Sequence, residues 1–255
     1  EFNTCQFVKP ISVVPLAIVA RQKELKFLDN TSYLKTIEFP DGQEISGFTT
    51  NGDTYFPLTR ADLLALDSSE REKKLRDLSD KYGCLLKNQI TDKDFKKRIG
   101  RNVSHLLISE MIDNIYEHAM AENAYIFSQY WQGIESCEIC LADNGMGIYN
   151  SLSKAQRNVT SDLDAVEQVI KNCLSAKDEY GSQKRGTGIR NTIKLLSNKE
   201  LKGFFCVISG SSGYFIDSDN RNYFLDLENL KWSGTIINMG FKKPTTKINI
   251  YDYIH

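Results

Sequence analysis

Four short apolar segments follow one another near the end of the chain and constrain its fold more than any other feature. They occupy residues 203–210, 213–218, 222–227 and 234–241. From about residue 91 onward the patterns before them are mostly helical, apart from a further apolar strand at residues 137–143. Helices followed by a run of antiparallel strands predict an α+β fold. We expect helices packed on one face of a mixed, mostly antiparallel sheet.

The composition is that of a globular protein without a polyanionic partner. The chain has 255 residues, of which 41% are apolar, and this suits a normally buried core. The 32 basic and 33 acidic residues nearly cancel, and no basic block favours nucleic acid or anionic lipid. The longest uncharged apolar run, residues 11–20, is too short to cross a bilayer. We therefore expect no nucleic-acid partner and no membrane span.

Six cysteines are scattered along the chain without the spacing of a disulfide framework. This pattern suits a reducing compartment, so we expect a cytoplasmic protein. Cys137 and Cys140 form a C-x-x-C pair, which is a common metal or redox signal. They lie in a predicted strand, where residues three apart point to opposite faces. This geometry favours two core cysteines.

The predicted elements divide the chain into three parts. Residues 1–60 form a small α/β unit, which is either a regulatory module or an extension of the next domain's sheet. Residues 61–92 form a helical connector. Residues 93–255 form the main domain.

The local predictions for the first two parts are short. A strand is expected at residues 5–12, then a helix that begins at Pro15, and then a Pro-Asp-Gly turn at residues 40–42. A second helix is expected from about residue 60 to residue 82, where Gly83 would end it.

A long helix is predicted after Thr91 or Asp92, either of which can serve as its N-cap. Its apolar stripe consists of Val103, Leu107, Ile108, Met111, Ile112, Ile115 and Ala119. The face turned away from this stripe carries four polar residues, Glu110, Asn114, Glu117 and His118. Such a face is either a solvated helix surface or part of a site.

Asp143 ends an apolar strand and is followed by Gly145 and Gly147. Glycines permit close backbone approach, and an acidic side chain beside them can accept a hydrogen bond from the exocyclic amine of a purine. The pattern indicates either a purine pocket or a plain Asp-Asn-Gly turn. A dinucleotide fingerprint is disfavoured, because Asn150 stands where its third glycine is required.

Gly186, Thr187 and Gly188 stand directly before an amphipathic helix, and Lys184 and Arg185 precede them. Free backbone N–H groups and the positive end of the helix dipole bind anions, so a phosphate is expected here. A P-loop is rejected for two reasons. Thr187 and Gly188 stand where Lys and Ser/Thr are required, and the preceding segment is helical rather than a strand.

Taken in order, these motifs resemble those of the GHKL family of Bergerat-fold ATPases and kinases, over roughly residues 93–243. "SEMIDNIYEH" resembles the family's N-box, "DNGMG" its first glycine box, "RGTGI" its second and "SGTIINMGF" its closing strand. The N-box is most similar to that of the anti-sigma-factor serine kinases, and residues 1–60 are faintly similar to STAS-like regulatory modules. The resemblance implies a Bergerat-type two-layer sandwich.

The resemblance also implies ATP and Mg²⁺ as ligands. Asn114 would supply an oxygen to Mg²⁺, and Glu110 would orient or deprotonate the nucleophile that attacks the γ-phosphate. Asp143 and Thr235 would contact the adenine, and Gly145, Gly147 and Ile148 would form the floor of its pocket. His118 would line the phosphate or ribose side. Gly186, Thr187 and Gly188 would hold the phosphates, and Lys177, Lys184 and Arg185 would close on the γ-phosphate. Residues 149–185 would form a lid over the nucleotide.

Three functions are compatible with this resemblance. The first is a slow ATPase switch whose nucleotide state sets an interface for a protein partner. The second is a serine/threonine kinase that acts on a partner, and the third is a non-catalytic ATP-binding module. None of His105, His118 and His255 has the context of a phospho-acceptor histidine, so autophosphorylation in cis is not expected. Many members of the family dimerise, which makes a homodimer one arrangement for this chain.

Overall fold

The computed structural model describes residues 8–27, 32–44, 54–63, 66–114, 120–176 and 187–253. The helices of this part are α1 (Pro10–Gln22), α2 (Ser32–Thr36), α3 (Ser68–Gln89), α4 (Lys93–Asn114), α5 (Gly147–Lys154), α6 (Asp162–Asn172) and α7 (Thr187–Leu196). The strands are β1 (Gln43–Glu44), β2 (Tyr55–Asp62), β3 (Asn123–Trp131), β4 (Ser136–Asp143), β5 (Phe204–Gly210), β6 (Ser212–Asp217), β7 (Asn222–Asp226) and β8 (Trp232–Lys242).

All the strands of the described residues belong to one sheet, in the order β1-β2-β3-β4-β8-β5-β6-β7. Only β1 and β2 pair in parallel, and every other neighbouring pair is antiparallel. The predicted α+β class with a mixed, mostly antiparallel sheet is therefore confirmed. The four strands expected at the end of the chain correspond to β5, β6, β7 and β8.

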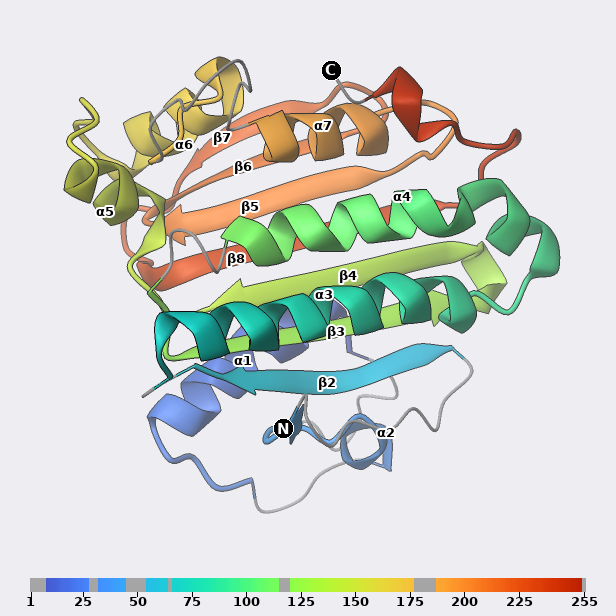
Figure 1. The fold of residues 1–255 in the computed structure, drawn as a ribbon, viewed down its shortest axis with the longest axis horizontal. Coiled ribbons are helices and arrows are strands. Elements are labelled where there is room, and N and C mark those ends of the chain that lie inside the picture. The colour runs from blue at the N-terminus through green and yellow to red at the C-terminus, as the bar shows by residue number, and fades with distance from the viewer. Residues whose placement is uncertain are drawn as a thin grey trace.

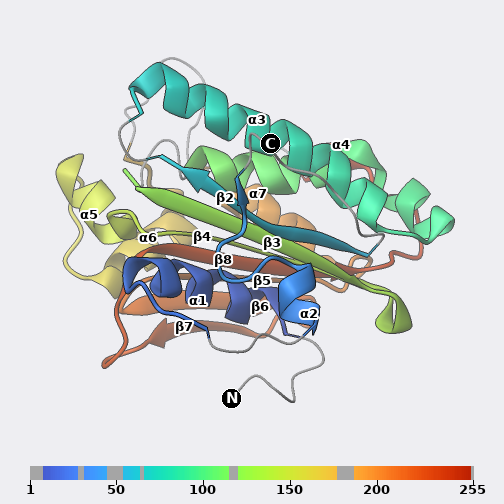
Figure 2. The same cartoon turned by 90° about the horizontal axis from the view of Figure 1, so that it is seen from below.

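Helices lie on both faces of the sheet. Helices α3, α4 and α7 cover one face, which we call the first face, and α1 and α2 lie against the other, the second face (Figures 1 and 2). The sequence predicted helices on one face only. The apolar residues of α1 explain the addition, because Val13, Val14, Ala17 and Ile18 are all buried against the second face.

The central strands are buried on both faces. In β4, Ile139 and Leu141 belong to the core under α4, whereas Cys140 and Ala142 belong to the core under α1. Successive residues of a strand point to opposite faces, so a strand between two helical layers needs apolar residues at nearly every position. This requirement makes polar residues on β4 and its neighbours informative.

Helix α4 packs on the first face as its stripe predicts. Val103, Leu107, Ile108, Met111 and Ile112 are all buried in one core cluster. Ile115 and Ala119 lie outside the described residues.

The N-cap of α4 is Asp92, whose Oδ1 accepts a hydrogen bond from the Phe95 amide at 2.8 Å. The helix bends at Gly100, where φ is +69°.

The strand predicted at residues 5–12 is wrong over its second half, because α1 begins at Pro10. Pro10 occupies the first turn, where its missing N–H costs nothing, and Pro15 lies inside the helix rather than at its start. No helix of the described residues combines the length and the apolar composition that a bilayer span requires.

The helix predicted from residue 60 is wrong at its start and at its end. Arg60 and Asp62 lie in β2, which pairs with β3. Helix α3 begins only at Ser68, after a capping box formed by Asp67 and Glu70, and it continues past Gly83.

Strands β1 and β2 extend the same sheet as the later strands, as in the second alternative for the amino-terminal residues. The division into units at residues 60 and 92 stays a prediction.

The double burial of the central strands can be tested with two matched leucines. Leu141 is 1% exposed on β4, and Leu230 is 70% exposed in the turn before β8. Leu141→Ala is expected to lower the free energy of unfolding by about 2–5 kcal/mol, because it leaves a cavity between packed layers. Leu230→Ala should change it by less than about 0.5 kcal/mol. Urea denaturation measures both, and equal effects would contradict this packing.

Candidate functional site

The ends of several elements meet at one end of the molecule. The carboxyl ends of β4 and α4 and the starts of β8 and α7 all lie toward the left in Figure 1. These ends carry Asp143, Glu110, Thr235 and Gly188, which the sequence predicts as site residues. Their contacts decide whether they form one arrangement.

The Asp143 carboxylate joins the loop after β4 to the start of β8. Its Oδ1 accepts a hydrogen bond from the Gly145 amide at 2.7 Å, and its Oδ2 accepts one from the Thr235 amide at 3.2 Å. The residue is 1% exposed. A buried carboxylate must be hydrogen-bonded to persist, and two backbone donors hold this one in place. Each of its oxygens can accept a further hydrogen bond from a ligand N–H.

Gly234 lets the start of β8 approach Asp143 closely. A Cβ at Gly234 would lie 2.2 Å from the Asp143 backbone oxygen and 2.7 Å from its Oδ1, and Gly234 has a φ of +108°. Both facts require glycine at this position. The Trp232 indole also donates to the Asp143 backbone oxygen at 3.0 Å. The start of β8 therefore positions Asp143 from two sides.

The Ser209 hydroxyl connects the first glycine motif to β8. It donates to the Gly234 oxygen at 2.9 Å and accepts from the Ile148 amide at 2.8 Å. A Cβ at Gly147, where φ is +75°, would lie 2.8 Å from the Ser209 oxygen. The predicted floor residues Gly147 and Ile148 thus pack directly against β5 and β8.

Sequence reasoning did not find Ser209 or Trp232. Neither lies in a recognised motif. They reach the Asp143 region only because β5 and β8 are neighbours in the sheet.

The carboxylate of Glu110 lies against Gly188. A Cβ at Gly188 would come within 1.6 Å of Glu110 Oε2, so any larger residue there would require the Glu110 side chain to move. Gly188 stands in the first turn of α7, and Glu110 lies in the last turns of α4. Residues 78 positions apart in the sequence are thereby brought into contact.

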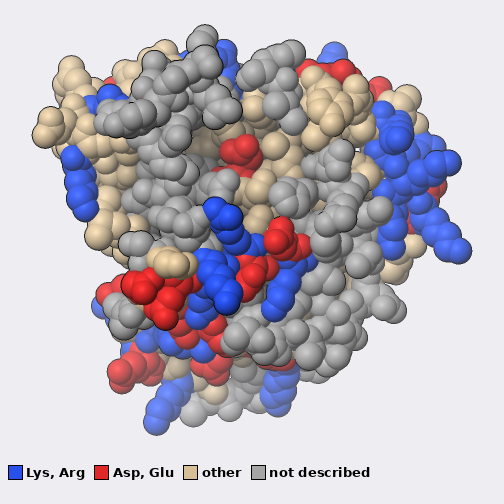
Figure 3. All heavy atoms as spheres, in the orientation of Figure 1, with Lys and Arg blue, Asp and Glu red and all other residues tan. Residues whose placement is uncertain are grey.

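The chain itself links the two halves of the site. Helix α4 ends at Asn114, and β3 begins at Asn123 with Ala124 paired to Asp143. The Asn144 side chain accepts from the Asn123 amide at 2.9 Å, which fixes this corner. The start of β3 is therefore held at the Asp143 end of the sheet. In the same orientation as Figure 1, Figure 3 shows a hollow between α7 and α4 with an acidic side chain at its bottom.

Several predicted residues lie outside the described part of the chain. These are His118, Lys177, Lys184, Arg185 and Gly186. The backbones of Asn114 and Thr187 are described as the end of α4 and the start of α7, but their side chains are not. Their predicted roles stay predictions.

The described residues fit an amino-bearing base better than they define a metal site. Asp143 offers acceptors, and Gly234 lets the start of β8 approach its carboxylate closely. No group of three or more His, Cys, Asp or Glu among the described residues is placed to hold a metal. A Mg²⁺ that keeps most of its waters and phosphate ligands needs few protein ligands, and the predicted contact with Asn114 stays a prediction.

Part of the segment predicted as a lid is anchored to the sheet. At the start of α6, Asp162 Oδ2 accepts from the Ser211 amide at 3.0 Å and from its hydroxyl at 3.1 Å. Near the end of α6, the Lys171 ammonium lies 4.6 Å from the centre of the Phe224 ring. The described half of this segment is thus docked over β5, β6 and β7.

The C-x-x-C pair is not a metal or redox site. Cys137 belongs to the core of the first face and Cys140 to that of the second, as the strand geometry predicts. Both thiols are free, and burial raises the pKa of each well above its ordinary value. Buried, protonated thiols of this kind are inert.

A scan of the chain against models of protein families finds no match, and a search of curated proteins finds none either. The GHKL resemblance therefore rests on the motifs themselves.

The close approach at Gly234 gives a test of the site's architecture. Gly234→Ala should lower the free energy of unfolding by about 1–3 kcal/mol, because the new methyl group meets Asp143 at an unfavourable φ. Gly133→Ala is the control, since a Cβ there would meet nothing within 4 Å. It should change stability by less than about 0.5 kcal/mol. Chemical denaturation distinguishes the two, and an unperturbed Gly234→Ala variant would refute this placement of β8.

Proposed function

We propose that the protein binds Mg-ATP in the manner of the GHKL family and acts as a slow ATPase switch in intracellular regulation. The observation that supports this most is that Asp143 and Glu110 stand at the same end of the sheet, with the Glu110 carboxylate close to Gly188. A bound nucleoside triphosphate needs an acceptor for its purine and a catalytic acid near its phosphates. Asp143 and Glu110 are candidates for these two roles.

In this proposal Asp143 recognises the adenine amino group. Its two backbone hydrogen bonds use one lone pair on each oxygen and hold the carboxylate rigidly. The 6-amino group of adenine would donate to a remaining lone pair, with Thr235 beside it. The nearby glycines Gly145 and Gly147 and the Ile148 amide would form the floor of the base pocket.

Glu110 is the proposed general base. It lies where the start of α7 would present backbone N–H groups to the phosphates, beside Gly188. From this place the carboxylate would orient or deprotonate a water that attacks the γ-phosphate. Mg²⁺, held by Asn114 and the phosphates, would neutralise the charge on the transferred group.

The remaining parts of the proposal concern the protein's surroundings. A nucleotide-dependent change near α7 and the lid would set an interface for a protein partner. Cys137, Cys140, Cys173 and Cys206 are free, which agrees with a reducing compartment such as the cytoplasm.

Adenine recognition by Asp143 can be tested by ligand-induced stabilisation. Mg-ATP at 100 times its dissociation constant should stabilise the protein by about 2.7 kcal/mol through mass action. In Asp143→Asn this shift should vanish when it is measured against the same variant without ATP. Comparison with the same variant without ATP removes the loss of stability that the substitution itself causes by weakening a backbone hydrogen bond. The control Asp41→Asn, at an exposed residue of the turn before β1, should keep the full shift. A retained shift in Asp143→Asn would mean that adenine is read elsewhere.

Hydrolysis by Glu110 can be tested by phosphate release. Glu110→Ala should reduce turnover by about 10²–10⁴-fold while ATP binding is retained, because only the base is removed. Glu228→Ala, at an exposed residue before β8, should leave turnover unchanged. Absence of turnover in the unmodified protein would refute the ATPase. Transfer of label from γ-labelled ATP to a protein partner would select the kinase instead.

A further inference from the structure

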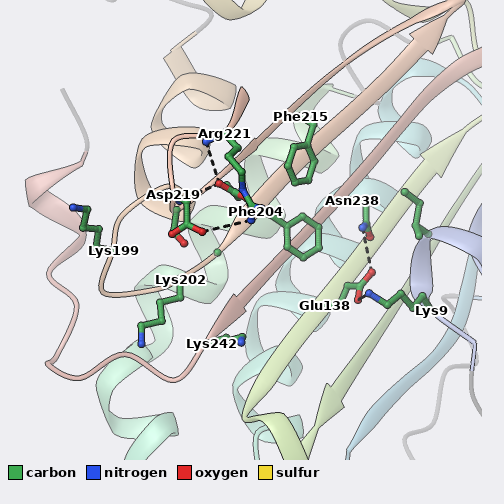
Figure 4. A pocket seen from close by; sticks show the side chains of 14 residues that line it. Lys9, Glu138, Lys199, Lys202, Phe204, Phe215, Asp219, Arg221, Asn238 and Lys242 are labelled. Carbon is green, nitrogen blue, oxygen red and sulfur yellow. Dashed lines mark hydrogen bonds and ion pairs between the residues drawn. The ribbon is translucent and has the colours of Figure 1, made fainter. Parts of the chain in front are cut away.

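A second cavity lies on the second face of the sheet, beside the start of α1 and away from the site described above. It measures about 830 Å³. Figure 4 shows its lining, with Lys9, Glu138 and Asn238 on one side, the Phe204 and Phe215 rings between, and Lys199, Lys202 and Asp219 on the other. A cavity of this volume is of the size that holds a small organic ligand.

The floor of this cavity contains a buried carboxylate and a buried amide. Glu138 on β4 is 5% exposed, and Asn238 on β8 is 4% exposed. The Asn238 Nδ2 donates to Glu138 Oε1 at 3.2 Å. The reverse orientation of the amide would place two oxygens together, so its Oδ1 points elsewhere. Within the described part of the chain, this Oδ1 has no hydrogen-bond partner.

An acceptor without a donor is costly at a buried position. Among the described residues, the other close partner of the Glu138 carboxylate is Lys9, whose Nζ lies 3.7 Å from Oε2 and whose side chain is 69% exposed. The floor therefore presents Lys9 as a donor and Glu138 as an acceptor, and Asn238 holds the carboxylate from the other side. In Figure 4 Glu138 lies between the other two.

The middle of the cavity is aromatic. The Phe204 ring covers Gly240, where a Cβ would come within 2.4 Å of the ring. Phe204 stacks on Phe215 with ring centres 6.2 Å apart, and Phe215 stacks on Tyr223 of β7. Glu138 and Phe204 both stand opposite Gly240 in the sheet register. Their backbones are therefore about 10 Å apart, given a strand spacing of about 4.8 Å.

The far side of the cavity is basic. Lys199, Lys202 and Lys242 line it, and among the described residues none of their ammonium groups makes a hydrogen bond or an ion pair. The Lys242 amide donates to the Leu201 oxygen at 2.8 Å, which holds Lys242 beside Lys202. Arg221 differs from these lysines, because its guanidinium is paired with Asp217 and Asp219. Three available cations favour an anionic group here.

We infer that this cavity binds a guanine nucleotide. The edge of guanine presents O6 as an acceptor and then N1–H and the 2-amino group as two adjacent donors, so Lys9 can donate to O6 and the Glu138 carboxylate can accept from N1–H and the 2-amino group. The base stacks on Phe204, and the phosphate reaches Lys202 and Lys242. Adenine fits poorly, because its N1 acceptor would face the Glu138 carboxylate.

The ligand chemistry can be tested by calorimetric titration of the whole chain with guanosine 5′-monophosphate. Saturable binding at one site is expected. Adenosine 5′-monophosphate should bind at least about tenfold more weakly, because it lacks the two adjacent donors. Guanosine should also bind at least about tenfold more weakly, because it lacks the phosphate. Absence of saturation up to about 1 mM, or equal affinity for the two nucleotides, would overturn the inference.

Two variants place the ligand in this cavity. Glu138→Gln should weaken binding of guanosine 5′-monophosphate at least about tenfold. The double variant Lys202→Ala/Lys242→Ala should weaken binding of the nucleotide but not of guanosine. Both lysines are exposed, so this variant still tests the inference if Glu138→Gln does not fold. The charge-matched control Lys23→Ala/Lys35→Ala, at exposed positions directly after α1 and in α2, should bind normally. Unchanged affinity in the Lys202/Lys242 variant would overturn the inference.

The Asp143→Asn variant separates this cavity from the site on the first face. It should bind guanosine 5′-monophosphate as the unmodified protein does, whatever the outcome for ATP. Loss of binding in Asp143→Asn together with normal binding in Glu138→Gln would place the nucleotide on the first face and refute this inference. Failure of the ATP proposal alone would leave it standing.

Discussion

The burial of the central strands on both faces is the constraint on which the rest of the structure depends. Strands β3, β4 and β8 lie between α4 on the first face and α1 on the second, so both sides of each strand must be largely apolar. Helix α1 exists in this place because the second face of these strands would otherwise expose Tyr125, Phe127 and their neighbours. One sheet thereby carries two cores.

Polar residues on such strands need partners, and the partners define the two candidate sites. Asp143 ends β4 and accepts hydrogen bonds from two backbone amides. Glu138 lies inside β4 and accepts one from the Asn238 side chain. The first arrangement fixes a carboxylate at an edge where helix termini and glycines converge. The second leaves Asn238 Oδ1 without a hydrogen-bond partner among the described residues. Both sites are places where the apolar rule for central strands is broken.

Local patterns predicted much of this fold. The strands β4 to β8, helices α6 and α7, and the stripe of α4 follow from apolar periodicity, which needs no knowledge of distant residues. The failures have tertiary causes. The segment around Arg60 has residues common in helices, but its pairing with β3 makes it a strand, and residues 10–14 become helical because they cover the second face. Tertiary contact overrode weak local preference in both cases.

The sequence by itself determined the residue types of the candidate nucleotide site, because acids, amides and glycines in fixed order carry their chemistry wherever the chain places them. It also determined that Cys137 and Cys140 point to opposite faces. Only the tertiary structure decided which of these groups meet. Glu110 reaches Gly188, Ser209 reaches Ile148, and Glu138 reaches Asn238 across 100 residues of chain, because strand order and helix packing bring them together. No short-range pattern encodes such contacts, since the free energy that makes them comes from burying whole faces at once.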